Sequence, residues 1–277
     1  MAIAAAARTA GDDGELRLAL RHVHVDGRRG ALLDLRDLTL ATGECLLLAG
    51  EPGQGNSALA LVATGRLRPT RGTVTLTGAD GPVHGAQAAL RAASAVVDLP
   101  GVSEPDDVLT VRTVVAEGLA LARRRADPWA VRRWLHEHQL WEHRERRIDD
   151  VYGPARTALL TSLAAESPHV RFLVLTLPDR HGGEAAGWWA VARTFAGRGY
   201  GVLVLASRSS ARDLGATLPA TRGDQSRTAP REALRLRPGP LTGAQATAEI
   251  LGLPEDPESR ATRSSRSGQR DERTADG

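Results

Sequence analysis

The chain contains 277 residues, 42% hydrophobic and 25% charged, a composition typical of a globular protein with one sizeable core. Its 36 basic residues are all arginine and the net charge is only +3, so the pI of about 9.9 reflects the high pKa of arginine and does not indicate a nucleic-acid partner. A single cysteine excludes an intrachain disulfide, and no apolar stretch approaches the roughly 20 residues that span a bilayer. We therefore expect a cytoplasmic protein that reaches a membrane only through a partner.

The first part of the chain has the period of half-buried strands. Residues 15–25 and 32–40 alternate apolar and polar side chains, and turns are predicted at Asp26-Gly27 and Thr42-Gly43. Residues 45–49 form a fully apolar strand, in which we expect Cys45 to be a buried and unreactive thiol. Residues 1–14 are expected to be disordered.

A glycine-rich stretch, residues 50–57, follows this apolar strand and precedes a helix predicted over residues 58–67. Glycines in such a loop let backbone N–H groups turn inward around a phosphate, towards which the next helix points its positive N-terminus. The pattern G-x-x-x-x-G-K-[ST] also requires a lysine and a hydroxyl, and here those positions hold Asn56 and Ser57. The candidate nucleotide-binding residues are Gly50, Gly53, Gln54, Gly55, Asn56, Ser57 and Ala58.

The missing lysine has a predictable cost. A charge-assisted hydrogen bond contributes about 1.5 to 3 kcal/mol, so its replacement by Asn56 is expected to weaken ATP binding about ten- to a hundred-fold. The Ser57 hydroxyl remains as a candidate Mg²⁺ ligand. Because similar glycine-rich turns occur without nucleotide, the loop alone leaves both interpretations open.

A further strand is predicted over residues 73–77, and from Leu35 to Gly78 the order and spacing of elements carry a family resemblance. The segment LRDLTLATGECLLLAGEPGQGNSALALVATGRLRPTRGTVTLTG resembles the opening of the ATP-binding cassette domain of ABC transporters. The resemblance implies an α/β P-loop cassette with a mixed sheet core, an N-terminal antiparallel β part and an α-helical subdomain. It would span residues 15–252, with the helical subdomain at about 108–168, a polar loop at about 209–230 and a disordered tail over 253–277.

The resemblance continues in two later segments. After the apolar residues 95–97, Asp98 stands near the place of the glutamine with which the family ends this strand, and it is a second candidate Mg²⁺ ligand. Residues 109–115, LTVRTVV, are similar to the opening of the family's helical subdomain. His24 is the nearest candidate for the aromatic residue that stacks on adenine in the family.

Residues 110–150 are predicted to be helical, with Asp127 as an N-cap and Pro128 at the first helical position. Trp129, Trp134 and Trp141 fall here, and either core packing or a docking surface would explain them. Three histidines nearby do not indicate zinc, because a spacing of two residues does not place side chains on one helix face. The arginine clusters of this region are interpreted as a solvated surface balanced by acidic neighbours.

The remaining family motifs are altered. Residues 151–156, VYGPAR, stand where the resemblance places the LSGGQ signature, before a helix predicted over 155–166. After the apolar strand 172–175, the resemblance places the metal-organising aspartate at Thr176 and the catalytic glutamate at Leu177. After a helix predicted over 185–196 and a strand from residue 201, the switch histidine falls at Arg208.

The sequence also predicts a closing strand at 233–237 and a last helix at 241–251.

Three functions remain possible from the sequence. The favoured one is the cassette subunit of an ABC-type membrane transport complex, at the inner face of the cell membrane, with weak or no ATP and Mg²⁺ binding and deficient hydrolysis. Its partners would be an integral membrane subunit and a second cassette. The alternatives are an active ATPase that uses Asp98 and Asp179 as substitutes, and a cytosolic scaffold without a transporter.

Overall fold

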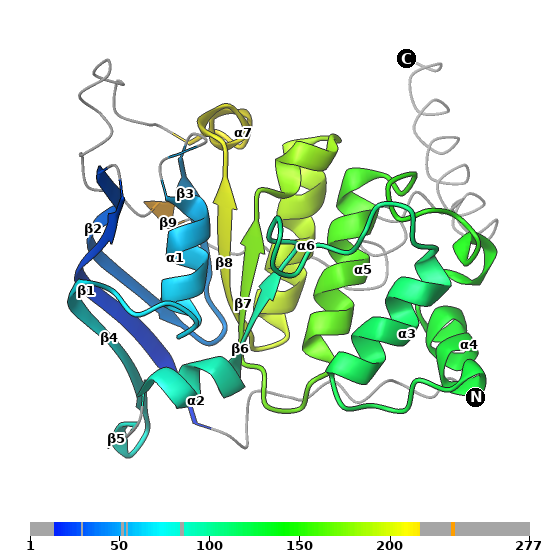
Figure 1. Ribbon diagram of the computed structural model, residues 1–277, viewed down its shortest axis with the longest axis horizontal. Coiled ribbons are helices and arrows are strands. Elements are labelled where there is room, and N and C mark those ends of the chain that lie inside the picture. Colours follow the sequence, from blue (N-terminus) through cyan, green and yellow to red (C-terminus); the bar gives the residue numbers. More distant parts are fainter. Residues whose placement is uncertain are drawn as a thin grey trace, which may run out of the picture.

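The computed structural model describes residues 14–28, 30–50, 53, 55–83, 86–216 and 234–235. These residues form two sheets with helices packed around them (Figure 1). Of the segments expected to be disordered, 1–14 and 253–277, all residues except Gly14 lie outside the described residues, as does the helix predicted over 241–251. Among the described residues, no helix has the length and hydrophobicity that a membrane span requires.

The first sheet is antiparallel and has the strand order β2-β1-β4-β5. Alternating side chains of β1, among them Leu18 and Leu20, are fully buried, as the period-2 pattern predicts. The two N-terminal strands predicted from the sequence are confirmed, the first shifted by two residues towards the C-terminus and the second longer than expected. The bounds are β1 Arg17–Gly27, β2 Gly30–Ala41, β4 Arg71–Gly78 and β5 Gly81–Pro82.

The second sheet has the order β6-β7-β8-β3-β9, with β6, β7, β8 and β3 parallel and β9 antiparallel to β3. Both of its faces are covered, since Leu46 and Leu48 of β3 contribute to one hydrophobic core and Cys45 and Leu47 to the other. This explains why these strands are continuously apolar. The bounds are β3 Cys45–Ala49, β6 Ser94–Val97, β7 Phe172–Thr176, β8 Gly201–Ala206 and β9 Leu234–Arg235.

Helices fill the space on each side of the parallel sheet. Helix α1 lies between the two sheets, whereas α5 and α6 lie on the opposite side, with α3 and α4 beyond α5 (Figure 1). The α-helices are α1 Asn56–Ala63, α2 Ala86–Ala93, α3 Val111–Leu121, α4 Pro128–Glu137, α5 Gly153–Ala165, α6 Ala185–Gly197 and α7 Arg208–Asp213. Two 3₁₀ turns are η1 Trp141–His143 and η2 Pro178–His181.

Two predicted segments are corrected. The helix expected to run to residue 67 ends at Ala63, because Gly65 takes a left-handed φ of 66° and the N–H groups of Gly65 and Arg66 bond back to Val62 and Leu61. This is the Schellman arrangement that stops a helix. The polar loop was expected to begin at residue 209, but residues up to Asp213 belong to α7. The Ser207 side chain caps this helix by accepting a hydrogen bond from the N–H of Ser210.

The tryptophans of the helical region differ in their surroundings. Trp134 is 4% exposed and belongs to a core cluster, whereas Trp129 is 77% exposed. Trp141 lies under the guanidinium groups of Arg132 and Arg144, 5.3 and 4.3 Å from its ring centroid. Core packing therefore explains Trp134 and, in part, Trp141, which packs against the same cluster, whereas Trp129 is left on the surface.

Candidate functional site

The phosphate-loop candidate joins β3 to α1 at the carboxyl edge of the parallel sheet. The N–H of Gly50 bonds to the carbonyl of Ala206 at the end of β8, over 2.9 Å. Gly53 and Gly55 have φ values of 80° and 82°, a backbone region that favours glycine. A Cβ at Gly55 would also collide with the backbone carbonyl of Leu32. Gln54 lies outside the described residues, as do residues 51 and 52 of the same loop.

Helix α1 begins with the residues that the sequence placed in this site. Asn56 is 6% exposed and its side-chain amide donates to the carbonyl of Gly50, over 3.4 Å. Ser57 is exposed and Ala58 is buried. The first turn carries no acidic residue, so the positive end of the helix dipole is not offset there. The loop and helix start thus suit an anion electrostatically, while the amide of Asn56 is bonded to the loop itself.

The two positions where the resemblance expects carboxylates end β7 at the same edge. Thr176 is 2% exposed and its hydroxyl donates to the carbonyl of Val97 on β6, over 2.7 Å. Leu177 has a φ of 47°, and its N–H bonds to the carbonyl of Leu205 on β8. Neither side chain offers a negative charge, and the hydroxyl of Thr176 is already used to join two strands.

Asp179, the carboxylate one residue beyond Pro178, is engaged elsewhere. Its Oδ2 accepts hydrogen bonds of 2.9 Å from the Ser207 N–H and from the Ser210 hydroxyl. Asp179 therefore anchors the start of α7 to η2. Arg208, at the position of the switch histidine, is the first residue of α7 and half-buried.

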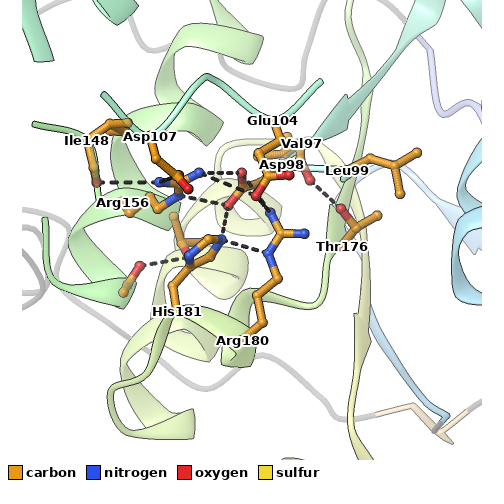
Figure 2. Close-up of polar contacts among 12 residues, drawn as sticks. Val97, Asp98, Leu99, Glu104, Asp107, Ile148, Arg156, Thr176, Arg180 and His181 are labelled. Atoms are coloured by element: carbon orange, nitrogen blue, oxygen red, sulfur yellow. Dashed lines mark hydrogen bonds and ion pairs between the residues drawn. The ribbon is translucent and has the colours of Figure 1, made fainter. Parts of the chain in front are cut away.

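Asp98 lies at the centre of a buried cluster of charges (Figure 2). Arg156 of α5 donates from Nε and Nη2 to the two oxygens of Asp98, each over 3.1 Å. Arg180 of η2 places Nη2 at 3.2 Å from Asp98 and at 2.7 Å from Glu104. The Nε2 atom of His181 lies 3.0 Å from Asp98. We call these five residues the Asp98 cluster.

Burial and charge act in opposite directions on the Asp98 carboxyl. Burial by itself raises its pKa, but hydrogen bonds from His181 and Arg156 and the charges of Arg156 and Arg180 outweigh burial and hold the pKa below its ordinary value. The carboxylate is thus ionised and paired. It also sits in a left-handed backbone conformation, with φ of 59°.

The segment at the place of the signature packs against its own chain. A Cβ at Gly153 would collide with the backbone carbonyl of Gly182, just after η2, so α5 starts in close contact with that segment. The Tyr152 hydroxyl accepts from the N–H of Glu184 over 3.4 Å. Tyr152 itself is 55% exposed.

The residues present do not fit a Mg²⁺ ion of the kind that the fold family uses. Ser57 offers a neutral hydroxyl, and Thr176 offers neither charge nor an unused hydroxyl hydrogen. Among the described residues, Asp98, Glu104 and His181 bring ligand atoms within 4.8 Å of one another, but two guanidinium groups already pair with these carboxylates. Among the described residues, the groups that suit a nucleotide are those of the anion-binding half, the loop and the helix dipole.

Sequence reasoning missed four members of the Asp98 cluster. Arg156, Arg180 and His181 lie far from Asp98 along the chain, which hides their contacts with it. Glu104 lies nearby in the sequence but belongs to no motif. His24, the adenine candidate, pairs with Asp26 over 2.9 Å, and its stacking role stays a prediction. A signal was available for Arg156, since an arginine two residues after a helix-starting proline in an otherwise apolar helix needs a buried partner.

Comparisons with known proteins identify the family that this chain resembles. A family model described as ABC transporter matches residues 33–157. The hemin import ATP-binding protein HmuV of Rhodopseudomonas palustris is 36% identical over 102 residues, which is 35% of this chain and 35% of that protein. The match thus spans about a third of the length of that relative. Residues 172–208, where the charged family residues are missing, lie beyond the family match.

Solved structures show the same fold. The dimeric structure of a bacterial ABC transporter cassette matches with a TM-score of 0.52 and 15% identity, covering 71% of this chain and 90% of that one. A nucleotide-free ATP-binding cassette from an ABC transporter matches with a TM-score of 0.50 and 16% identity, covering 70% and 82%. The chain therefore has the fold of the ATP-binding cassette of ABC transporters and resembles that family in sequence.

Proposed function

We propose that this chain is the cassette subunit of an ABC-type membrane transport complex, that it binds nucleotide weakly, and that it does not hydrolyse ATP. The observation that carries the proposal is the Thr176 hydroxyl, which bonds to Val97 at the position where hydrolysis requires a metal-organising carboxylate. Leu177 next to it cannot orient an attacking water. Phosphoryl transfer needs a metal, a water-positioning group and a cation on the developing charge, and this site has none of the usual residues.

The contacts of two aspartates argue against an ATPase with substitute residues. Asp98 is paired with two arginines, and Asp179 holds the start of α7 through Ser207 and Ser210. Either carboxylate would have to leave buried charge-assisted bonds before it could bind a metal, at about 1.5 to 3 kcal/mol for each bond. Both therefore serve better as structural anchors than as catalytic groups.

The setting of the proposed subunit follows from the family. ABC cassettes act with membrane-embedded subunits, and the curated relative is named for hemin import, which supports an importer located at the cytoplasmic face of a membrane. We infer an integral membrane subunit as the first partner and a second cassette as the second. Co-purification of this chain with the membrane protein encoded beside its gene tests this, and a chain that purifies only with soluble proteins would favour the scaffold instead.

Nucleotide titration tests the binding half of the proposal. In the wild type, we expect ATP to bind weakly through the loop amides and the α1 dipole. The variant Asn56→Lys restores the charge-assisted bond and is expected to raise the affinity about ten- to a hundred-fold. The variant Asn56→Ala serves as a control that removes the amide without adding charge. Equal ATP affinity in all three proteins would show that the loop does not bind the phosphates.

A further inference from the structure

The charges of the Asp98 cluster need no added cation for balance. Arg156 and Arg180 supply two positive charges, Asp98 and Glu104 supply two negative ones, and the exposed carboxylate of Asp107 lies 3.7 Å from Nη1 of Arg156 at the edge of the cluster. Arg156 and Asp98 have side chains only 1% and 6% exposed, so solvent screens their interaction little. A guanidinium cannot lose its proton in a protein, which makes both positive charges permanent.

We propose that the guanidinium of Arg180 is the resident cation of this cluster, occupying by itself the place that a divalent metal would take among Asp98, Glu104 and His181. These three side chains offer two carboxylates and an imidazole within 4.8 Å, a ligand set suited to a transition metal such as Mn²⁺. Arg180 already touches all three. Its Nη2 reaches both carboxylates, and its Nε lies 2.7 Å from Nε2 of His181, the same nitrogen that lies 3.0 Å from Asp98 (Figure 2).

Electrostatics then excludes a metal from the wild-type cluster. Like charges repel strongly where solvent screens them little, so a divalent ion beside two guanidinium groups is opposed by both of them. Removing Arg180 leaves one guanidinium against two carboxylates and frees the imidazole nitrogen. The balance of the cluster then favours an added cation.

The arginines also join three separate parts of the chain. Asp98 and Glu104 belong to the segment after β6, Arg156 to α5, and Arg180 and His181 to η2. Bidentate pairing fixes the orientation as well as the distance of the groups, which a single point charge would not. The cluster thus holds these segments together without metal and without nucleotide, and the inference does not depend on the proposed function.

Mn²⁺ binding to the metal-free, nucleotide-free full chain tests the proposal, with loss of the free-ion paramagnetic signal as the readout. The wild type is expected to bind no Mn²⁺ at the cluster. Arg180→Ala is expected to bind about one equivalent of Mn²⁺, with an affinity at least ten-fold above any background binding by the wild type. Adding Asp98→Asn to Arg180→Ala should abolish this gain. The matched control is Arg133→Ala, which breaks the exposed pair with Glu137 and should bind as the wild type does.

Thermal unfolding of the same proteins keeps the proposal testable if Arg180→Ala is poorly folded. A variant that keeps the aliphatic stem, Arg180→Met, is then expected to be stabilised by Mn²⁺ while the wild type is not. Wild-type binding of Mn²⁺ that Asp98→Asn abolishes would overturn the proposal, because the cluster would then be a metal site with Arg180 in place. Folded Arg180 variants without any gain in Mn²⁺ affinity would overturn it too.

Discussion

The carboxyl of Asp98 shows how a single buried side chain can stabilise the fold. Two arginines and His181 surround it, and their hydrogen bonds and charges keep its pKa below the ordinary range although burial opposes this. A carboxyl with a depressed folded-state pKa stabilises the fold above its unfolded pKa of about 3.9 and loses that contribution as the pH falls through its folded pKa. Its effect should therefore be full at neutral pH and disappear in acid.

The pH dependence of stability tests the role of Asp98. Asp98→Asn leaves Arg156 without its charge partner in a buried place, so at pH 7 we expect a loss of about 3 to 5 kcal/mol in the free energy of unfolding. Below about pH 4 the difference from the wild type should begin to shrink, because the unfolded chain then binds a proton at Asp98 that the folded carboxylate does not yet bind. Urea unfolding at pH 7 and in acid measures both values.

The control is Asp37→Asn, which removes a half-exposed pair with Arg21 and should cost about 0 to 1 kcal/mol at either pH. A constant difference between Asp98→Asn and the wild type across the whole pH range would contradict the ionised state assigned to Asp98.

At the scale of elements, local rules predicted some boundaries and failed at others. The sequence Asp127-Pro128 correctly predicted the start of α4. The Asp127 carboxylate accepts hydrogen bonds from the N–H groups of Trp129 and Ala130, which are only two and three residues away. The predicted end of α1 was wrong because the prediction did not treat Gly65 as the residue that stops the helix. Helix α2 was not predicted, because its alanine-rich sequence has too few large apolar side chains to reveal a helical periodicity.

The candidate site was predicted only where its chemistry is local. The glycines of the loop and the start of α1 follow each other in the chain, so their pattern is visible in the sequence. The Asp98 cluster joins residues that are far apart in the chain, 58 positions for Asp98 and Arg156 and 76 positions for Glu104 and Arg180, and no local rule finds such pairs. Motif reasoning located Asp98 but assigned it to a metal, because the paired arginines could not be seen.

Two glycines of the loop allow a matched test of local strain. Both Gly53 and Gly55 have left-handed φ values, but only a Cβ at Gly55 would meet the Leu32 carbonyl, whereas nothing lies within 4 Å of a Cβ at Gly53. We expect Gly53→Ala to cost about 1 to 2 kcal/mol in unfolding free energy and Gly55→Ala about 2 to 4 kcal/mol. Denaturant unfolding measures both, and equal costs would mean that Leu32 does not restrict the loop.

At the scale of the whole molecule, the resemblance to ABC cassettes leads us to predict how two cassettes would pair around nucleotide. In the family, the signature of one cassette contacts the nucleotide held by the other, and here the segment VYGPAR packs against the residues after η2 of its own chain. Two copies of this chain would form two sites, each altered in both the loop and the signature. Nucleotide should therefore add little to association.

Light scattering after size-exclusion chromatography tests this pairing. We expect a monomer of 29.4 kDa with and without ATP, and association only with a membrane subunit or a second, different cassette. A shift to a dimer that requires ATP would show that the VYGPAR segment contacts phosphate across the interface.

The most direct test of the account is steady-state ATP turnover by the purified chain with Mg²⁺. Because Thr176 and Leu177 supply neither a metal-organising carboxylate nor a group that positions water, we predict turnover at the background level, and Asn56→Lys should not raise it. Sustained hydrolysis by the wild type that disappears in Ser57→Ala would contradict the account, since it would show that this loop serves a working catalytic site.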